Sequence, residues 1–368
     1  MSTPGAVHAQ RALRTFGALT GARLYEARRH LFGRRRWWWG RRHYEHLWPF
    51  ADAWSATATL ASLAGGRRAR DVLPGFMAGV SAYGGEAGPD PAGDARPDPA
   101  GHGAVGHGAV GFESSVTAPL GPGGDRYYDD NAWVGLALVA HHRLRPGDGA
   151  LDLARRVFAF VVSGWSTDVS WRNPGGIRWI EPASSLTRNT CANAPAAELG
   201  ALLSTEAGDE ACRWALRIYD WVRATLRRPD GLYADHVSPD GTLDPAVWSY
   251  NQGSMIGAGV LLHRRTGEAA YLSHAQETAR AAMARFDVPL LASEGPTFAA
   301  VFLRNLLLLD DVAPDPRHRA LALAFADHMW EHGRDRRTGL FGGGAAPLNP
   351  AAGMVQVLAL AAGAPPHP

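Results

Sequence analysis

Residues 127–140 read Tyr-Tyr-Asp-Asp-Asn-Ala-Trp-Val-Gly-Leu-Ala-Leu-Val-Ala, so aromatic and acidic residues stand directly before a run of small and apolar ones. Residues 248–262 repeat this arrangement, with Trp-Ser-Tyr-Asn-Gln-Gly before a second apolar run. Each stretch predicts a helix that begins beside polar and aromatic side chains. At such a helix N-terminus the backbone N–H groups are unpaired and the helix dipole favours negative charge.

The same unit recurs along the chain: a polar or aromatic loop, a helix rich in Ala, Gly and Leu, a short turn, and an amphipathic helix. Five such partner helices are predicted, and a helix over residues 8–32 supplies a sixth if it packs beside the last unit. The first helices of the six units start near Trp54, Asp129, Asn193, Asn251, Phe298 and Asn349.

Six helical hairpins that close on themselves form an all-α (α/α)6 barrel, with small-residue helices inside and amphipathic helices outside. An open solenoid is the alternative, and the uneven loop lengths together with the pairing of the terminal helices favour closure. We therefore predict a single domain over residues 1–368. Residues 84–112 are mostly Gly, Pro, Asp and Ala, which predicts a mobile loop because so little apolar surface is available for burial. Its histidines, His102 and His107, are expected to be solvated.

Composition excludes several classes of protein. The chain has 368 residues, a net charge of +2, and 20% charged and 46% hydrophobic residues, so the total charge gives no sign of nucleic-acid binding. No apolar run reaches the roughly 18 residues of a membrane-spanning helix, and no secretory signal precedes Arg11, so we expect a cytoplasmic protein. We also expect a monomer.

Cys191 and Cys212 have no metal-ligand spacing and are expected to be reduced and packed. Neither a metal nor a cofactor is predicted.

The segment that begins at Arg34 and ends at Trp39 carries three arginines followed by three tryptophans. Such a segment suits weak association with a membrane or a glycolipid. The alternative, which we favour, is a helix end whose tryptophans pack on the rim of the barrel.

Asp129 and Asp130 form the only adjacent acid pair set between aromatic residues, which makes them candidates for a two-carboxylate site. The other interpretation is helix capping, with Asp129 as the N-cap. Aromatic rings stack on sugar rings, and amides and acids bind sugar hydroxyls, so we predict further substrate contacts nearby. Asp52 and Trp54 are weaker candidates. The predicted contacts are Tyr128, Trp133, Trp179, Asn193, Asp235, Trp248, Tyr250, Asn251 and Gln252.

Four motifs, at residues 128–133, 176–179, 189–195 and 248–253, occur in the order found in glycoside hydrolase family 76, and the chain resembles that family from about residue 48 to 341. The resemblance implies an (α/α)6 barrel and endo-acting cleavage of α-1,6-mannan with retention of configuration. The substrate implied is a mannan or a mannosylated glycan or glycolipid.

The resemblance also implies roles for the acid pair, with Asp129 as the nucleophile and Asp130 as the acid/base. Retaining hydrolysis requires one ionised and one protonated carboxyl group about 5–5.5 Å apart. A helix N-terminus would stabilise the ionised nucleophile, and closeness to that charge would raise the pKa of the acid. Two alternatives stay open at this point. A sugar epimerase would need a histidine pair, for which His236 and His263 are the nearest candidates, and a glycan-binding protein would keep the cleft without catalysis.

Overall fold

The computed structural model of the chain describes residues 4–21, 24–35, 42–85, 108–182, 184–342 and 348–367. The predictions for Trp37, Trp38, Trp39, His102 and His107 fall outside these residues.

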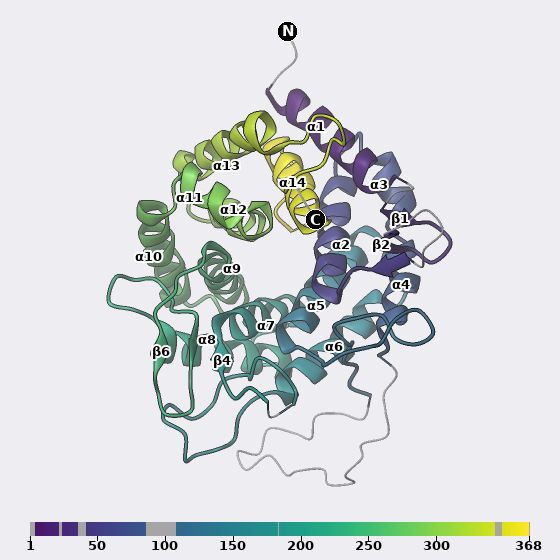
Figure 1. The fold of residues 1–368 in the computed structure, drawn as a ribbon. Helices are drawn as coiled ribbons and strands as arrows, with labels where there is room; N and C mark the ends of the chain where they lie inside the picture. The colour runs from purple at the N-terminus through teal and green to yellow at the C-terminus, as the bar shows by residue number, and fades with distance from the viewer. Residues whose placement is uncertain are drawn as a thin grey trace.

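Six helices form a closed inner ring. Each contacts the next, and the last contacts the first, so the predicted (α/α)6 barrel is confirmed and the open solenoid is excluded (Figure 1). In ring order the inner helices are α2 (Leu47–Ala61), α5 (Tyr128–Leu144), α7 (Thr190–Leu203), α9 (Ser249–Thr266), α12 (Pro296–Asp310) and α14 (Leu348–Ala361).

An outer layer of helices packs on this ring. Each inner helix pairs with one outer partner, and α1 pairs with α14, as predicted for the N-terminal helix. The partner of α2 is broken around Pro74 into α3 and α4 instead of forming one helix. The outer helices are α1 (Pro4–Leu19), α3 (Arg67–Val72) with α4 (Gly75–Val80), α6 (Ala150–Ser163), α8 (Glu210–Leu226), α10 (Ala269–Arg285) and α13 (Pro316–His328). Three short helices join them: η1 (Ser81–Tyr83), α11 (Val288–Glu294) and η2 (Met329–Gly333).

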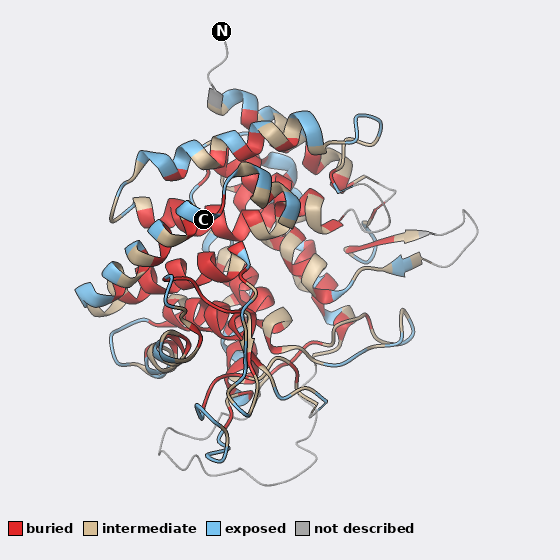
Figure 2. Cartoon of the chain, turned by 60° about the vertical axis from the view of Figure 1, so that its left-hand side comes forward, coloured by how far each residue is buried: buried red, intermediate tan, exposed pale blue. Residues whose placement is uncertain are grey.

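The two layers differ because their sequences differ. Inner helices are buried on nearly all sides, and small residues allow their backbones to approach: a Cβ atom on Gly253 of α9 would lie 2.6 Å from the Cα of Phe302 in α12. Outer helices bury one stripe, as α8 does with Ala215, Ile218 and Val222. Figure 2 shows the outcome, with red inner helices and outer helices that are pale blue on one side.

The predicted helix over residues 8–32 is wrong beyond Leu19. Strands β1 (Tyr25–Glu26), β2 (Leu31–Arg35) and β3 (Arg42–Tyr44) follow it as an antiparallel sheet. The helix ends before Gly21, and Gly33 lets β3 approach so closely that a Cβ there would lie 2.5 Å from the carbonyl oxygen of His43. Arg34 therefore lies in a strand, so the predicted helix end at this segment is wrong too.

A second small sheet joins the loops that precede α7 and α9. It contains β4 (Arg188–Asn189), β5 (His236–Val237) and β6 (Leu243–Asp244), all antiparallel. Among the helices described, none is long and apolar enough to cross a bilayer.

Candidate active site

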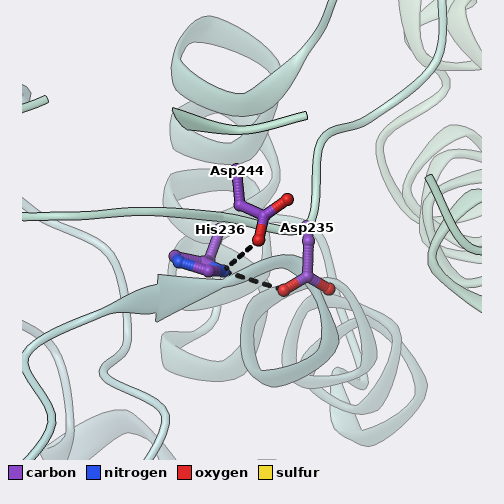
Figure 3. A group of neighbouring side chains, drawn as sticks. All are labelled: Asp235, His236 and Asp244. Carbon is purple, nitrogen blue, oxygen red and sulfur yellow. Dashed lines mark hydrogen bonds and ion pairs between the residues drawn. The ribbon is translucent and has the colours of Figure 1, made fainter. Parts of the chain in front are cut away.

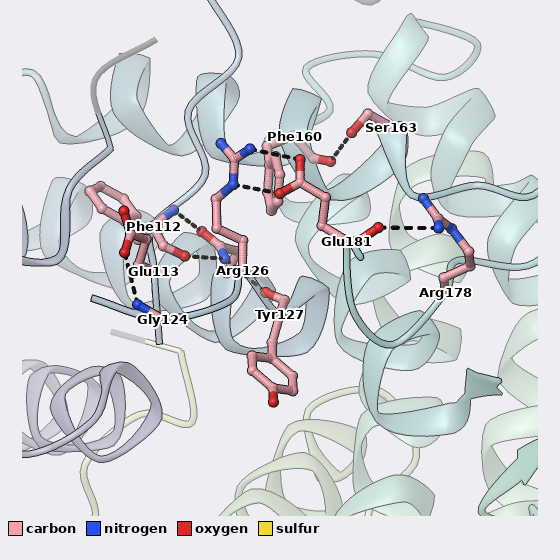
Figure 4. Close-up of polar contacts among 10 residues, drawn as sticks. Phe112, Glu113, Gly124, Arg126, Tyr127, Phe160, Ser163, Arg178 and Glu181 are labelled. Atoms are coloured by element: carbon pink, nitrogen blue, oxygen red, sulfur yellow. Dashed lines mark hydrogen bonds and ion pairs between the residues drawn. The ribbon is translucent and has the colours of Figure 1, made fainter. Parts of the chain in front are cut away.

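The N-terminus of α5 is fixed by the side chain of Asn131, the fourth residue of the helix. Its Oδ1 accepts a hydrogen bond from the backbone N–H of Phe112 at 2.8 Å. Its Nδ2 donates to the carbonyl oxygens of Phe112 at 3.0 Å and Tyr127 at 2.7 Å. A bidentate ion pair between Arg126 and Glu181, at 2.6 and 2.8 Å, ties the chain before α5 to the loop before α7 (Figure 4).

The fourth residues of two further inner helices act in the same way. Asn193 of α7 clamps the backbone of Ile177, with hydrogen bonds of 2.7 and 2.8 Å. Gln252 of α9 clamps the backbone of Tyr233 at 2.8 and 3.1 Å. We name Asn131, Asn193 and Gln252 the amide clamps. All three are fully buried, and Asn193 and Gln252, both predicted as sugar contacts, do not line the cleft: their polar atoms are used to hold loops.

The first turns of all six inner helices line one cleft of about 840 Å³. Their contributions to its lining are Trp48 and Pro49 of α2, Asp129, Asp130 and Trp133 of α5, Cys191 of α7, Tyr250 of α9, Phe298 of α12 and Asn349 of α14.

Aromatic rings form two walls of this cleft. On one side Trp48 stacks on Phe298 with ring centroids 6.0 Å apart, and Phe298 lies 4.2 Å from the ring of Tyr250. The other wall, over α5 and α7, is formed by Tyr127 and Trp179, whose rings meet edge to face at 5.1 Å. Flat apolar faces on both sides of a polar floor suit a chain of sugar rings.

Asp129 accepts three hydrogen bonds on its carboxylate. The indole Nε1 of Trp179 donates to Oδ2 at 3.0 Å, the thiol of Cys191 donates to Oδ2 at 3.4 Å, and the backbone N–H of Asp130 donates to Oδ1 at 3.0 Å. Burial raises the pKa of Asp129, and these hydrogen bonds to the charged form oppose that rise.

Asp130 is in a different electrostatic position. Burial raises its pKa well above the ordinary value, and the charges of Asp129 and Asp52 raise it further. The pair is therefore divided: Asp129 is the carboxyl that ionises first, and Asp130 is the one that keeps a proton. Neither is the N-cap, because Asp129 and Asp130 are the second and third residues of α5 and Tyr127 precedes it.

Asp235 and His236 add a polar corner to the cleft (Figure 3). His236 Nδ1 and Asp235 Oδ2 are hydrogen-bonded at 2.8 Å, and Asp244 Oδ2 lies 3.9 Å from the same nitrogen. Among the described residues this is the one group of three or more Asp, Glu, His or Cys side chains whose ligand atoms all lie within 4.8 Å of one another. It is a donor set of the kind that binds a cation, but the hydrogen bond between its members already accounts for its geometry.

Several predicted site residues lie elsewhere. Tyr128 is buried against Phe160 of the outer layer at 5.0 Å, since its side chain points away from the cleft. Trp54 is buried and donates to His141 Nδ1 at 3.0 Å. Two others, Asn251 and Trp248, lie in the first turn of α9 and directly before that helix, respectively.

Asn251 is fully buried beneath the cleft, and Trp248 lies at its margin, in edge contact with Phe298. Of the two histidines considered for an epimerase, His236 is in the cleft, whereas His263 is in the last turn of α9 and bonds to the backbone of Glu268. They do not form a pair.

Sequence reasoning missed most of the residues that line the cleft. The missed residues are His46, Trp48, Pro49, Ser114, Tyr127, Ser185, Thr187, Asn189, Cys191, Phe298 and Asn349. A usable signal existed for some of them: Trp48, Cys191, Phe298 and Asn349 each stand at the start of a predicted inner helix.

An (α/α)6 barrel whose cleft holds an acid pair between aromatic walls defines a class of protein, the carbohydrate-active barrels. Comparison with known proteins gives the family. The sequence profile of glycosyl hydrolase family 76 matches residues 117–326, more than half of the chain, and the chain belongs to that family.

Two curated relatives are similar over part of their length. Mannan endo-1,6-alpha-mannosidase DCW1 of Candida glabrata is 26% identical over 220 residues, which is 52% of this chain and 49% of the relative. The protein of the same name from Saccharomyces cerevisiae is 25% identical over 221 residues, again 49% of its length. The chain spans about half the length of these curated relatives.

Solved structures match over the whole barrel. The family 76 mannosidase Bt3792 from Bacteroides thetaiotaomicron has a TM-score of 0.79 at 19% identity, with 97% of this chain and 98% of that one covered. The α-1,6-mannanase GH76A of Salegentibacter has a TM-score of 0.73 at 22% identity, with 96% and 99% covered. An inactive variant of that mannanase, with two consecutive aspartates changed to asparagine, was solved in complex with α-1,6-mannotriose. At these identities the likeness establishes the fold.

Proposed function

We propose that this chain is a retaining glycoside hydrolase that cleaves α-1,6-mannosidic linkages, with Asp129 as the nucleophile and Asp130 as the acid/base. The observation that carries the proposal is the asymmetry of the pair: three hydrogen bonds stabilise the carboxylate of Asp129, while burial and two neighbouring charges keep Asp130 protonated. The mannan linkage is supported by the names of the yeast relatives and by the mannotriose bound to the inactive mannanase.

The reaction follows from this division. An oxygen of Asp129 forms a bond to the anomeric carbon as the bond from that carbon to the leaving oxygen breaks, and Asp130 gives its proton to that oxygen. The product is a glycosyl ester on Asp129. Asp130, now ionised, takes a proton from a water molecule whose oxygen attacks the anomeric carbon, which frees Asp129 and restores the proton on Asp130. Two displacements retain the configuration.

The two aromatic walls hold the sugar chain over the pair. Trp179 has two functions in this arrangement, because its ring forms part of one wall while its Nε1–H donates to Asp129. A wall fixed by a hydrogen bond to the nucleophile aligns sugar and carboxylate together.

The test is hydrolysis of α-1,6-mannotetraose, followed by NMR of the first product formed. We expect the wild type to release a shorter oligomer with retained α configuration. Asp129→Asn is expected to abolish release, and Asp130→Asn to slow it by about 10²–10⁴-fold. Asp152→Asn, a matched change at an exposed carboxylate on α6, should leave the rate unchanged. Wild-type rates in Asp129→Asn, or an inverted product, would contradict the proposal. An epimerised sugar would support the epimerase, and binding without turnover a glycan-binding protein.

A further inference from the structure

The second residues of three consecutive inner helices line the cleft. They are Asp129 of α5, Cys191 of α7 and Tyr250 of α9. Helix α7 packs between α5 and α9 in the ring (Figure 1), and an amide clamp at the fourth residue of each helix holds it against its loop. Cys191 therefore lies between the proposed nucleophile and an aromatic residue of the cleft wall.

The thiol of Cys191 donates a hydrogen bond to Asp129. Its Sγ lies 3.4 Å from Oδ2 of the carboxylate, and only 6% of the residue is exposed. Burial raises the pKa of the thiol well above its ordinary value, and the charges of Asp129 and Asp235 raise it further. The sulfur therefore keeps its proton and remains a donor. The side chain of Tyr250 hydrogen-bonds to the same sulfur.

Two donors from outside α5 meet on Oδ2 of Asp129. The indole Nε1 of Trp179, in the loop before α7, donates at 3.0 Å, and Cys191 donates from α7 itself. An ionised carboxylate oxygen has two lone pairs, so these two donors occupy Oδ2 and limit the rotation of the carboxylate about its Cβ–Cγ bond. The hydrogen bond to Oδ1 comes from the backbone of the same helix, at the N–H of Asp130.

We propose that Cys191 is a positioning residue of the active site, whose S–H acts with the N–H of Trp179 to hold the Asp129 carboxylate in the orientation from which it attacks the sugar. The inference rests on the proposed function, because it takes Asp129 to be the nucleophile. Cys191 forms no bond to the sugar in this scheme; it acts through Asp129. A thiol is a weak donor, so it orients the carboxylate while leaving its charge available for the attack.

Other titratable groups lie around Asp129, and their effects are separate from that of Cys191. Asp130 keeps a proton, and burial raises the pKa values of Tyr127 and Tyr250, so these three side chains are neutral when Asp129 ionises. A change at Cys191 alone leaves every one of these groups in place. The groups that face Asp129, Asp130 or the two donors are Asp52, Tyr127, Asp235, His236 and Tyr250.

The two cysteines of the chain provide a matched pair of variants. Cys191→Ala removes the S–H beside Asp129, and Cys191→Ser replaces it with a hydroxyl donor. Cys212→Ala removes a thiol that is fully buried on the outer helix α8, away from the cleft. Retained circular dichroism and melting temperature would establish that each variant folds.

The first measurement is the pH dependence of kcat/KM on α-1,6-mannotetraose. Asp129 must be ionised to attack, so activity falls as pH drops through its pKa. In Cys191→Ala a hydrogen bond to the charged form is lost, so the acid limb should move to higher pH and kcat/KM on the acid side should fall about threefold to tenfold relative to the plateau.

The controls separate this effect from a structural one. Cys212→Ala should keep the wild-type limb, and the limb of Cys191→Ser should lie between those of wild type and Cys191→Ala. On the plateau of Cys191→Ala, kcat should fall while KM is nearly unchanged, because the sugar contacts remain. An unmoved limb in Cys191→Ala, an equal shift in Cys212→Ala, or a Cys191→Ser limb no closer to wild type would overturn the proposal.

The second measurement does not require turnover. The S–H stretching band of a thiol moves to lower frequency when the thiol donates a hydrogen bond, and the Raman band of Cys191 is the one lost in Cys191→Ser. As pH falls and Asp129 takes up a proton, this band should move to higher frequency, because a neutral carboxyl is a weaker acceptor. It should stay fixed in Asp129→Asn, as should the band of Cys212.

A Cys191 band that does not move with pH in the wild type would overturn the proposal, since the thiol would then not donate to the carboxylate. If the wild type cleaves no mannan, the proposed function fails, while this titration still decides whether Cys191 holds Asp129.

Discussion

The ion pair between Glu198 and Arg304 crosses the inside of the barrel. Glu198 is on α7 and Arg304 on α12, which are not neighbours in the ring, and the atoms are 2.7 Å apart with 0% and 6% of the side chains exposed. Asn305 Nδ2 donates to the second oxygen of Glu198 at 3.4 Å, and His367 Nε2 lies 3.3 Å from the first. Burial alone would raise the pKa of Glu198, but the charge of Arg304 and the hydrogen bond from His367 lower it overall. The perturbation we consider is Glu198→Gln, which keeps the shape and removes the charge.

The expected loss of stability in Glu198→Gln follows from the charge of Arg304, which stays buried without its partner. A buried ion whose partner is removed destabilises a protein by about 3–5 kcal/mol. Unfolding entropy near 60 °C is about 2.1 cal/mol/K per residue, or about 0.8 kcal/mol/K for 368 residues. The melting temperature should therefore fall by about 4–6 °C.

Differential scanning calorimetry at pH 7 measures this change. The matched control is Asp152→Asn, which breaks an exposed pair with Arg155 and should lower the melting temperature by about 1 °C or less. The double variant Glu198→Gln/Arg304→Met removes both charges and should recover part of the loss, since no buried ion is then unpaired. If Glu198→Gln melts within 1 °C of the control, the pair does not contribute as its burial implies.

Three further outcomes are expected. Trp179→Phe removes the N–H that stabilises the Asp129 carboxylate, so the pKa of Asp129 should rise and the acid limb of the kcat/KM profile should move to higher pH; an unmoved limb would exclude this role. Burial lowers the pKa of His367 to about 4 from 6.5, so the folded protein keeps it neutral while the unfolded chain takes up a proton, and the free energy of unfolding should fall as pH drops from about 6.5 to 4. Urea titrations at several pH values should find this part of the dependence missing in His367→Gln. Phe298→Ala removes the ring between Trp48 and Tyr250 and should lower kcat/KM by about two- to tenfold, measured on mannotetraose, with little effect if the wall does not bind sugar.

The barrel was predictable because its signal is repeated. Each inner helix is rich in small residues and each outer helix has an apolar stripe, so six weak patterns supported one architecture. The strands after Leu19 were not predictable in this way. Leu24 continues the helical spacing of Leu13 and Phe16, yet it is buried beside a sheet whose formation depends on tertiary contacts of Phe32 and Phe76.

The cleft was predictable in part for a physical reason. Asp129 and Asp130 are unusual in sequence because carboxyl groups seldom stand among aromatic residues. Gln252 looks equally unusual, but a buried amide that satisfies loop backbone has the same sequence signature as one that binds a ligand. Phe298 was missed for the opposite reason. In the sequence, a phenylalanine that lines a cleft looks the same as a phenylalanine that packs in the core.

The amide clamps also bear on how this barrel can be re-engineered. Each clamp joins one inner helix to one backbone position in the preceding loop: Asn131 to Phe112, Asn193 to Ile177, and Gln252 to Tyr233. The clamp accepts from an N–H and donates to a C=O, and so places no demand on the side chain of the loop residue. Loops from other barrels can therefore be grafted between the anchors, provided that one residue with free backbone groups meets each amide. In this barrel the residues that hold the loops in place are therefore different from the loop side chains that can contact the substrate.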